Sequence, residues 1–163
     1  MQTGKSENYS LIENLINLLN KGQAHVTLDE ALKDIPFEIL GEKPDNLPYS
    51  LWQIADHIRI AQSDILQFSK DPNYESPDWP EGYWPDNAKP SSEENWKDCL
   101  KQIKNDREAF ISLLKDSSEN LFAVFENGNG QTLLREALVL ADHNSYHTGE
   151  IIILRRLLDN WRK

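Results

Sequence analysis

The 163-residue sequence has a single cysteine, Cys99, so it has no second thiol with which to form an internal disulfide. It also lacks a long apolar run. The longest stretch of large aliphatic residues, 151–154, is far shorter than the roughly 20 residues that a bilayer-spanning helix needs. Cations are scarce as well: 17 lysines and arginines stand against 27 acidic residues, and the net charge of -10 repels phosphate backbones. These absences predict a cytoplasmic protein whose partners are neither nucleic acids nor membranes.

The composition is that of a globular protein. Hydrophobic residues make up 39% of the chain and charged residues 27%, and a chain of this length can bury a sizeable core. We therefore expect one domain that covers residues 1–163. In such a core Cys99 is expected to be a structural thiol, because no basic residue is placed to ionise it.

Apolar residues recur at steps of three and four along four long segments, which is the period of an amphipathic helix. The first segment, 7–20, ends before Gly22, a residue type suited to a helix C-terminus. A short helix is expected over 28–34. The second long helix is expected over 51–68, and the last within 131–161.

Three of the predicted helices begin with a capping box, in which a hydroxyl accepts a hydrogen bond from the third helical amide and the third side chain reaches back. The boxes lie at 27–30, before the short helix, at 50–53, before the second long helix, and at 91–94, before the third long helix. Thr132 can cap the last helix.

The segment 71–90 differs from the rest of the chain. It contains five prolines and two tryptophans, Trp79 and Trp84, and this density of proline excludes a helix. The aromatic side chains argue against disorder, because they have surface to bury. Two interpretations remain open: the segment is a lid or wall over a functional site, or it is a packed crossover that covers the flank of the helices.

Four long helices, one short helix and a long connection between the second and third long helices predict an all-α protein. The sequence shows neither the alternating pattern typical of strands nor a strong internal repeat. We expect a four-helix bundle, an architecture whose core often holds metal sites.

Two of the four histidines, His143 and His147, lie four residues apart in the last helix. This spacing places both imidazoles on one face, one turn apart, within the apolar stripe of that helix. A third, His57, lies at the edge of the apolar stripe of the second long helix. Neutral imidazoles are good ligands for zinc, nickel, copper and iron, and three protein ligands leave positions open for water or substrate. The alternative is a set of hydrogen-bonded core histidines.

Three carboxylates lie on nearly the same helix faces as the histidines. Glu150 is three residues after one histidine of the last helix, Glu136 is seven residues before the other, and Asp64 is seven residues after the histidine of the second long helix. Each can orient a ligand or act as a base, and the alternative is an ordinary solvated carboxylate. We expect Tyr146, about 100° around the helix from His147, to have a packing role and not a catalytic one.

The motifs around the three histidines resemble those of the DinB-like (DinB/YfiT) superfamily. The matching residues are PYSLWQIADHI at 48–58, HNSYHTGEI at 143–151 and LRR at 154–156. The proline- and tryptophan-rich connection resembles one branch of the same superfamily. The likeness covers nearly the whole chain, and the combination of one histidine followed much later by His-x3-His is moderately specific.

This resemblance implies a four-helix bundle in an up-down-down-up order, with a divalent metal ion held by His57, His143 and His147. It also implies a homodimer. Relatives in the superfamily include thiol-dependent S-transferases, which use mycothiol, bacillithiol or glutathione, and a maleylpyruvate isomerase. In this branch a histidine matching His25 recurs at the start of the short helix. We expect it to cap or pack, and the alternative is a residue that lines the pocket or adds a ligand.

The leading hypothesis is a metal-dependent enzyme, a hydrolase or a thiol S-transferase. A zinc, nickel or iron ion would activate a water or a low-molecular-weight thiol for attack on a small-molecule substrate, and Glu150 or Glu136 would orient the ligands. The alternative is a non-catalytic metal-binding protein, a stress-related or structural dimer. An enzyme predicts a cavity beside the histidines, whereas a structural site predicts closure by a fourth protein ligand, for which His25 is the obvious candidate.

Overall fold

The computed structural model describes residues 3–45, 47–118 and 120–161, with side chains from Asn8 onward. In these ranges the chain is helical, with one isolated bridge between Val124 and Thr132 and no strand, so the predicted all-α class is confirmed. None of the described helices is long and apolar enough to cross a membrane. The α-helices are α1 (Thr3–Lys21), α2 (Leu28–Leu32), α3 (Leu51–Lys70), α4 (Glu93–Asp116) and α5 (Leu133–Leu157), and the 3-10 helices are η1 (Phe37–Ile39) and η2 (Glu81–Tyr83).

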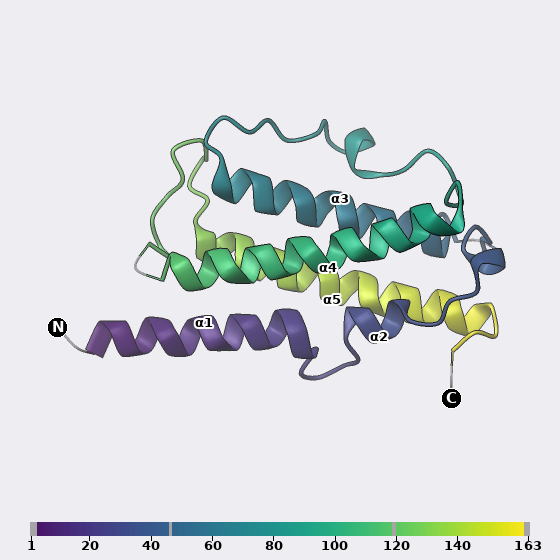
Figure 1. Ribbon diagram of the computed structural model, residues 1–163, viewed down its shortest axis with the longest axis horizontal. Coiled ribbons are helices and arrows are strands. Elements are labelled where there is room, and N and C mark those ends of the chain that lie inside the picture. The colour runs from purple at the N-terminus through teal and green to yellow at the C-terminus, as the bar shows by residue number, and fades with distance from the viewer. Residues whose placement is uncertain (1–2, 46, 119, 162–163) are drawn as a thin grey trace.

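Helix α5 has the most neighbours of the five α-helices. It packs against α1, α2 and α3, while α4 packs against α3 and α1. In Figure 1, α1 and α2 follow one another along the same side of α5. The segment between α3 and α4 runs back along the whole length of α3, so that α3 and α4 point in the same direction (Figure 1). This return path brings the proline-rich segment over the middle of α3.

The helix ends follow local sequence signals with one shift. Thr27 and Ser50 form the predicted capping boxes, Thr132 caps α5, and Gly22 has a φ of 59° after α1. Helix α4, however, begins one residue later than predicted. Its cap is Ser92 and not Ser91. The short helix α2 ends at Leu32, before the expected end at residue 34.

The shift at the start of α4 has a side-chain cause. The Ser92 hydroxyl accepts from the backbone amide of Asn95, and the Asn95 side-chain oxygen accepts from the backbone amide of Ser91, both at 3.1 Å. The cap bond is therefore made by Ser92 to Asn95, where we expected Ser91 to Glu94. The Asn95 side chain reaches back to Ser91 and not to the cap residue itself, so the reciprocal pair that defines a capping box is not formed here. Adjacent serines offer the same hydroxyl, so the sequence alone does not distinguish them.

The apolar core consists of two clusters with a polar layer between them. One cluster joins α2 to the first half of α3 and the second half of α5, and the other joins α1 to the opposite halves of those helices. A hydrophobic side chain is easily accommodated in either cluster, whereas a polar one needs a partner inside the protein. Between the clusters, the buried residues include Gln62 on α3, Asp106 and Arg107 on α4, and Asn144, His147 and Thr148 on α5.

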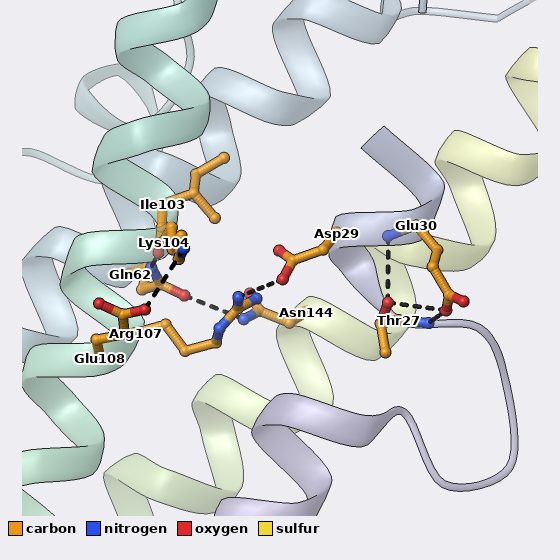
Figure 2. A network of polar contacts seen from close by, with 9 residues as sticks. All are labelled: Thr27, Asp29, Glu30, Gln62, Ile103, Lys104, Arg107, Glu108 and Asn144. Atoms are coloured by element: carbon orange, nitrogen blue, oxygen red, sulfur yellow. Dashed lines mark hydrogen bonds and ion pairs between the residues drawn. The ribbon is translucent and has the colours of Figure 1, made fainter. Parts of the chain in front are cut away.

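Part of this polar layer ties the short helix to the rest of the fold. The buried Arg107 of α4 donates to Asp29 of α2 at 2.6 Å, and the Thr27 capping box lies on the same short helix (Figure 2). Gln62 and Asn144 meet close by in the same view. The polar layer therefore contains hydrogen bonds that join α2 to α4 and α3 to α5, and His57 and His147 are also among the buried polar residues.

Cys99 is buried in the larger of these clusters, as the sequence predicted. Burial, with a smaller effect of the nearby Asp56 carboxylate, raises the pKa of its thiol to about 12. At pH 8 roughly one thiol in ten thousand is then ionised, so iodoacetamide is expected to leave the folded protein unlabelled over hours. Mass spectrometry measures the added carbamidomethyl group. The urea-unfolded protein should be labelled within minutes, and equally fast labelling of the folded protein would contradict this burial.

Candidate metal centre

Three histidines from two helices converge at the middle of the protein. His57 comes from α3, and His143 and His147 come from successive turns of α5. One ring nitrogen from each lies within 4.8 Å of the other two. The Nε2 atoms of His57 and His143 are 3.0 Å apart. The structure thus brings together all three residues that the sequence nominated as ligands.

The outer nitrogens of two of these rings have acceptors that set their tautomers. His57 Nδ1 lies 2.8 Å from the backbone oxygen of Tyr83, and His147 Nδ1 lies 2.7 Å from a carboxylate oxygen of Glu150. A carbonyl or carboxylate oxygen only accepts, so each Nδ1 carries the proton. The Nε2 lone pairs of both rings are left to point toward the cluster, which is the arrangement of a histidine metal ligand.

The chemistry of this donor set fits a small divalent cation. Two Nε2 lone pairs at 3.0 Å repel unless a proton or a cation lies between them. Burial lowers the pKa of His57 and brings that of His143 and of His147 to about 4, so all three rings are neutral near pH 7. A neutral ring can bind a metal ion without first losing a proton. Bond lengths of about 2.0–2.1 Å in a tetrahedron require ligand nitrogens roughly 3.3 Å apart, close to the 3.0 Å between the Nε2 atoms of His57 and His143.

The segment between α3 and α4 forms a wall of this centre. The Trp84 ring stacks on His57 at 3.9 Å with an interplanar angle of 0°, and Tyr49 stacks on the other side of the indole at 3.9 Å and 10°. The Tyr83 hydroxyl donates to Asp64 of α3 at 2.7 Å. Of the two interpretations of this segment, the structure therefore favours a wall of the site over a packed crossover that only covers the flank of the helices. The prediction that it contains no helix was too strict, since η2 makes one 3-10 turn there.

The three candidate carboxylates take different places. Glu150 contacts His147 directly. Glu136 is 2% exposed and forms an ion pair with Arg135 at 2.7 Å, and not a bond to a histidine. Asp64 binds the Tyr83 hydroxyl and acts on the site through the wall. The helical period placed all three carboxylates on the faces that carry the histidines. Glu136 and Asp64, however, lie about two turns along the helix from His143 and His57, which separates them from the rings.

A cavity of about 730 Å³ opens beside the cluster, and all three histidines line it. Tyr146 also lines it and is 64% exposed, and its ring lies edge-on against the His147 ring, with the centroids 4.9 Å apart. Residue Arg135 and its partner Glu136 lie at the cavity as well. The apolar and aromatic part of the wall consists of Ala61, Ile65, Phe68, Trp79, Tyr83, Trp84 and Val139.

His25 does not join the cluster. Its Nδ1 lies 2.7 Å from the backbone oxygen of Val26, and its Nε2 lies 3.0 Å from the Ser145 hydroxyl. It lines a separate cavity of about 290 Å³. Within the part of the chain that the structure describes, the candidate metal-binding group contains three histidines and no fourth ligand. The suggestion that His25 closes the site is therefore wrong, and its contacts fit the packing role.

A family model described as the DinB superfamily matches residues 22–151. The chain belongs to the DinB superfamily. The matched range includes His57, His143 and His147, and the whole wall segment. No curated protein and no solved structure matches the chain significantly. Membership in the DinB superfamily is thus established by the family model, and the arrangement of this member's site comes from its own structure.

Sequence reasoning missed several groups that shape the site of this DinB superfamily member. The Tyr83 contribution is a backbone carbonyl, which no side-chain pattern can reveal. Trp84 was noted only as part of an aromatic segment, and its stacking on His57 depends on how that segment returns over α3. Asn144 stood out only as the residue after a histidine, although its side chain is buried and hydrogen-bonded to α3. The density of aromatic residues was the one available signal.

Replacing Trp84 by alanine is expected to weaken zinc binding by roughly tenfold, because it removes the ring that holds His57 and loosens the carbonyl beside it. Competition with a chromophoric chelator measures the change in Kd. The matched control is Trp79→Ala in the same segment, whose indole is 73% exposed. Equal zinc affinities for the two variants would show that stacking on His57 does not support the site.

Proposed function

We propose that this DinB superfamily protein binds a divalent metal ion, zinc, nickel or iron, through His57, His143 and His147. We further propose that it is a metal-dependent enzyme, a hydrolase or a thiol S-transferase. The main support is the cavity of about 730 Å³ that all three histidines line. A structural metal site is closed by four protein ligands, whereas three ligands beside a cavity leave room for a reacting molecule.

The chain's own groups would prepare the ligands for this role. A divalent ion held by the three Nε2 atoms would lower the pKa of a water or thiol that reaches it. The Tyr83 carbonyl and the Glu150 carboxylate accept from the outer nitrogens of His57 and His147, which fixes the rings and increases their basicity. Glu150 lines a different, smaller cavity of about 160 Å³. Its proposed role is therefore to orient His147 and not to contact the substrate.

The walls of the cavity support a small organic substrate with an apolar body. Ile65, Phe68 and Val139 offer apolar surface, and Trp84 covers one face of the His57 ring. The ion pair of Glu136 and Arg135 lies seven or eight residues from His143, which is about 10–12 Å along the helix axis. This distance suits contact with the far end of a substrate. We propose that Glu136 takes part in binding there and not in proton transfer at the metal.

A turnover assay with defined metal content tests the enzyme proposal. The protein is loaded separately with zinc, nickel and iron(II) and offered glutathione, bacillithiol or mycothiol together with small alkyl halides, epoxides and activated esters. Loss of free thiol and release of acid are followed in parallel. We expect turnover that rises in proportion to bound metal and is absent from His147→Ala. Fully loaded protein that turns over none of these compounds, while gaining stability from the metal, would favour the non-catalytic alternative.

The alternative, a stress-related or structural metal-binding dimer, is favoured by one observation. The ligands come from α3 and α5, so an ion would join two helices that are distant in sequence, and any ligand that binds only the folded state stabilises it. Under this alternative, chelation lowers the melting temperature and changes no reaction rate.

We also propose that the long helices form the four-helix bundle in up-down-down-up order, and that the protein is a cytoplasmic homodimer. Its partner would be a small molecule, with a low-molecular-weight thiol as cosubstrate in the S-transferase case, and not nucleic acid or membrane, given the net charge of -10. Light scattering coupled to size-exclusion chromatography measures the oligomeric state.

A further inference from the structure

Two buried amide side chains link three helices one turn away from the histidine cluster. Gln62 of α3 is fully buried, and its Nε2 donates to the backbone oxygen of Ile103 in the middle of α4. Its Oε1 accepts from Nδ2 of Asn144 on α5 at 3.2 Å. Figure 2 shows the two amides meeting between the helices. Asn144 is the residue directly after His143, so this link ends beside the site.

The direction of this hydrogen-bond chain is determined by its first member. A peptide carbonyl can only accept, so Gln62 must turn its NH2 group toward Ile103. The Gln62 oxygen then faces Asn144, which must donate to it from its own NH2 group. The side-chain oxygen of Asn144 is thereby left on the opposite side of its amide. The orientation of both amides follows from the network, which is how such groups are assigned.

Two buried polar atoms remain without a hydrogen-bond partner next to each other in sequence. One is Oδ1 of Asn144, an acceptor, and the other is Nδ1 of His143, which can carry a proton. Buried polar groups are rarely left unpaired, because desolvation without a partner costs free energy.

Metal binding would decide where the single proton of a neutral His143 lies. Its Nε2 is 3.0 Å from Nε2 of His57, so without a cation the proton can sit between these two rings. A cation held by the three rings would take that place, and the proton of His143 would then be on Nδ1, which is buried and needs an acceptor.

We propose that Asn144 is the outer hydrogen-bond partner of His143 in the metal-bound protein, and that Gln62 and the Ile103 carbonyl hold it in the accepting orientation. The proposal rests on the metal site proposed above. Each ring would then have its own acceptor: Tyr83 for His57, Glu150 for His147 and Asn144 for His143. Asn144 and Gln62 are positioning residues, since they act on the metal through a ligand.

Zinc affinity, measured by chelator competition, tests this assignment. Asn144→Leu removes the acceptor and is expected to weaken zinc binding by roughly 10- to 100-fold, the usual effect of losing an outer partner. Asn144→Asp keeps an acceptor for His143 but loses the bond to Gln62, so its loss of affinity should resemble that of Gln62→Leu and stay below that of Asn144→Leu. Gln62→Leu should lose less affinity than Asn144→Leu, because the acceptor survives without its support.

Thr148→Val is the matched control. Thr148 is buried on α5 one turn from Asn144, and its hydroxyl donates to the Asn144 backbone oxygen and not to the amide chain. It loses a buried hydrogen bond without touching the proposed acceptor, so its zinc affinity should match wild type.

A second readout uses the wild-type protein, so the test does not depend on Asn144→Leu folding. In zinc-loaded, 15N-histidine-labelled protein, the Nδ1 proton of His143 should be visible and slow to exchange with water. It should persist in Asn144→Asp and exchange rapidly in folded Asn144→Leu. Rapid exchange in wild type, or full zinc affinity in Asn144→Leu, would overturn the assignment alone. Wild-type protein that binds no zinc, nickel or iron would overturn the metal site and this inference with it.

Discussion

The His147→Ala variant is expected to lose its metal ion completely under conditions in which wild-type protein retains about one ion per chain. The substitution removes one of three ligands together with the bond to Glu150, and two imidazoles on separate helices form a poor site. The loss should exceed the roughly 100-fold change that removal of an outer partner causes. Inductively coupled plasma mass spectrometry of untagged protein, purified without chelators, measures zinc, nickel and iron per chain.

The control for this measurement is His25→Ala. His25 bonds to Val26 and Ser145 and lies outside the cluster, so this variant should keep its metal. Loss of metal from both variants would mean that folding and not ligation was disturbed, and circular dichroism separates these cases. Metal that remains in His147→Ala, or wild-type protein that takes up none of the three ions when they are offered, would be incompatible with a three-histidine site.

The Arg155→Ala substitution is expected to lower the free energy of unfolding by about 2–4 kcal/mol relative to wild type. Arg155 is buried on α5 and donates to the backbone oxygens of Ala31 and Lys33, at 2.7 and 2.9 Å, and to Asn160. Hydrogen bonds from a charged group contribute about 1.5–3 kcal/mol each, and losing them leaves the carbonyls at the end of α2 without these donors. Urea denaturation followed by circular dichroism measures the free energy of unfolding.

Arg156→Ala is the matched control, because Arg156 is the next residue, has the same side chain and is exposed. Its free energy of unfolding should stay within about 0.5 kcal/mol of wild type. The centroid of the Trp161 ring lies 4.9 Å from the Arg155 guanidinium carbon, so this ring packs against Arg155. Equal stability of the two arginine variants would show that the contacts between α5 and α2 contribute little.

The parts of the fold that depend on neighbouring residues could be predicted from the sequence. Apolar spacing located the helices, and the hydroxyls of Thr27 and Ser50 marked two starts because a cap bonds within three residues. The same rule was ambiguous at Ser91 and Ser92, where two identical side chains compete for one position. Predictions within a helical turn were thus reliable except where adjacent residues were chemically equivalent.

The candidate site was only partly predictable in this way. The sequence by itself determined that His143 and His147 share a face and that Glu150 can reach the latter, because a helix repeats every 3.6 residues. That His57 meets them, that the Tyr83 carbonyl and Trp84 hold it, and that His25 stays apart were decided by tertiary structure. These contacts depend on the register of α3 against α5 and on the return path of residues 71–92. Such long-range geometry arises from the packing of the whole chain, and no local pattern encodes it.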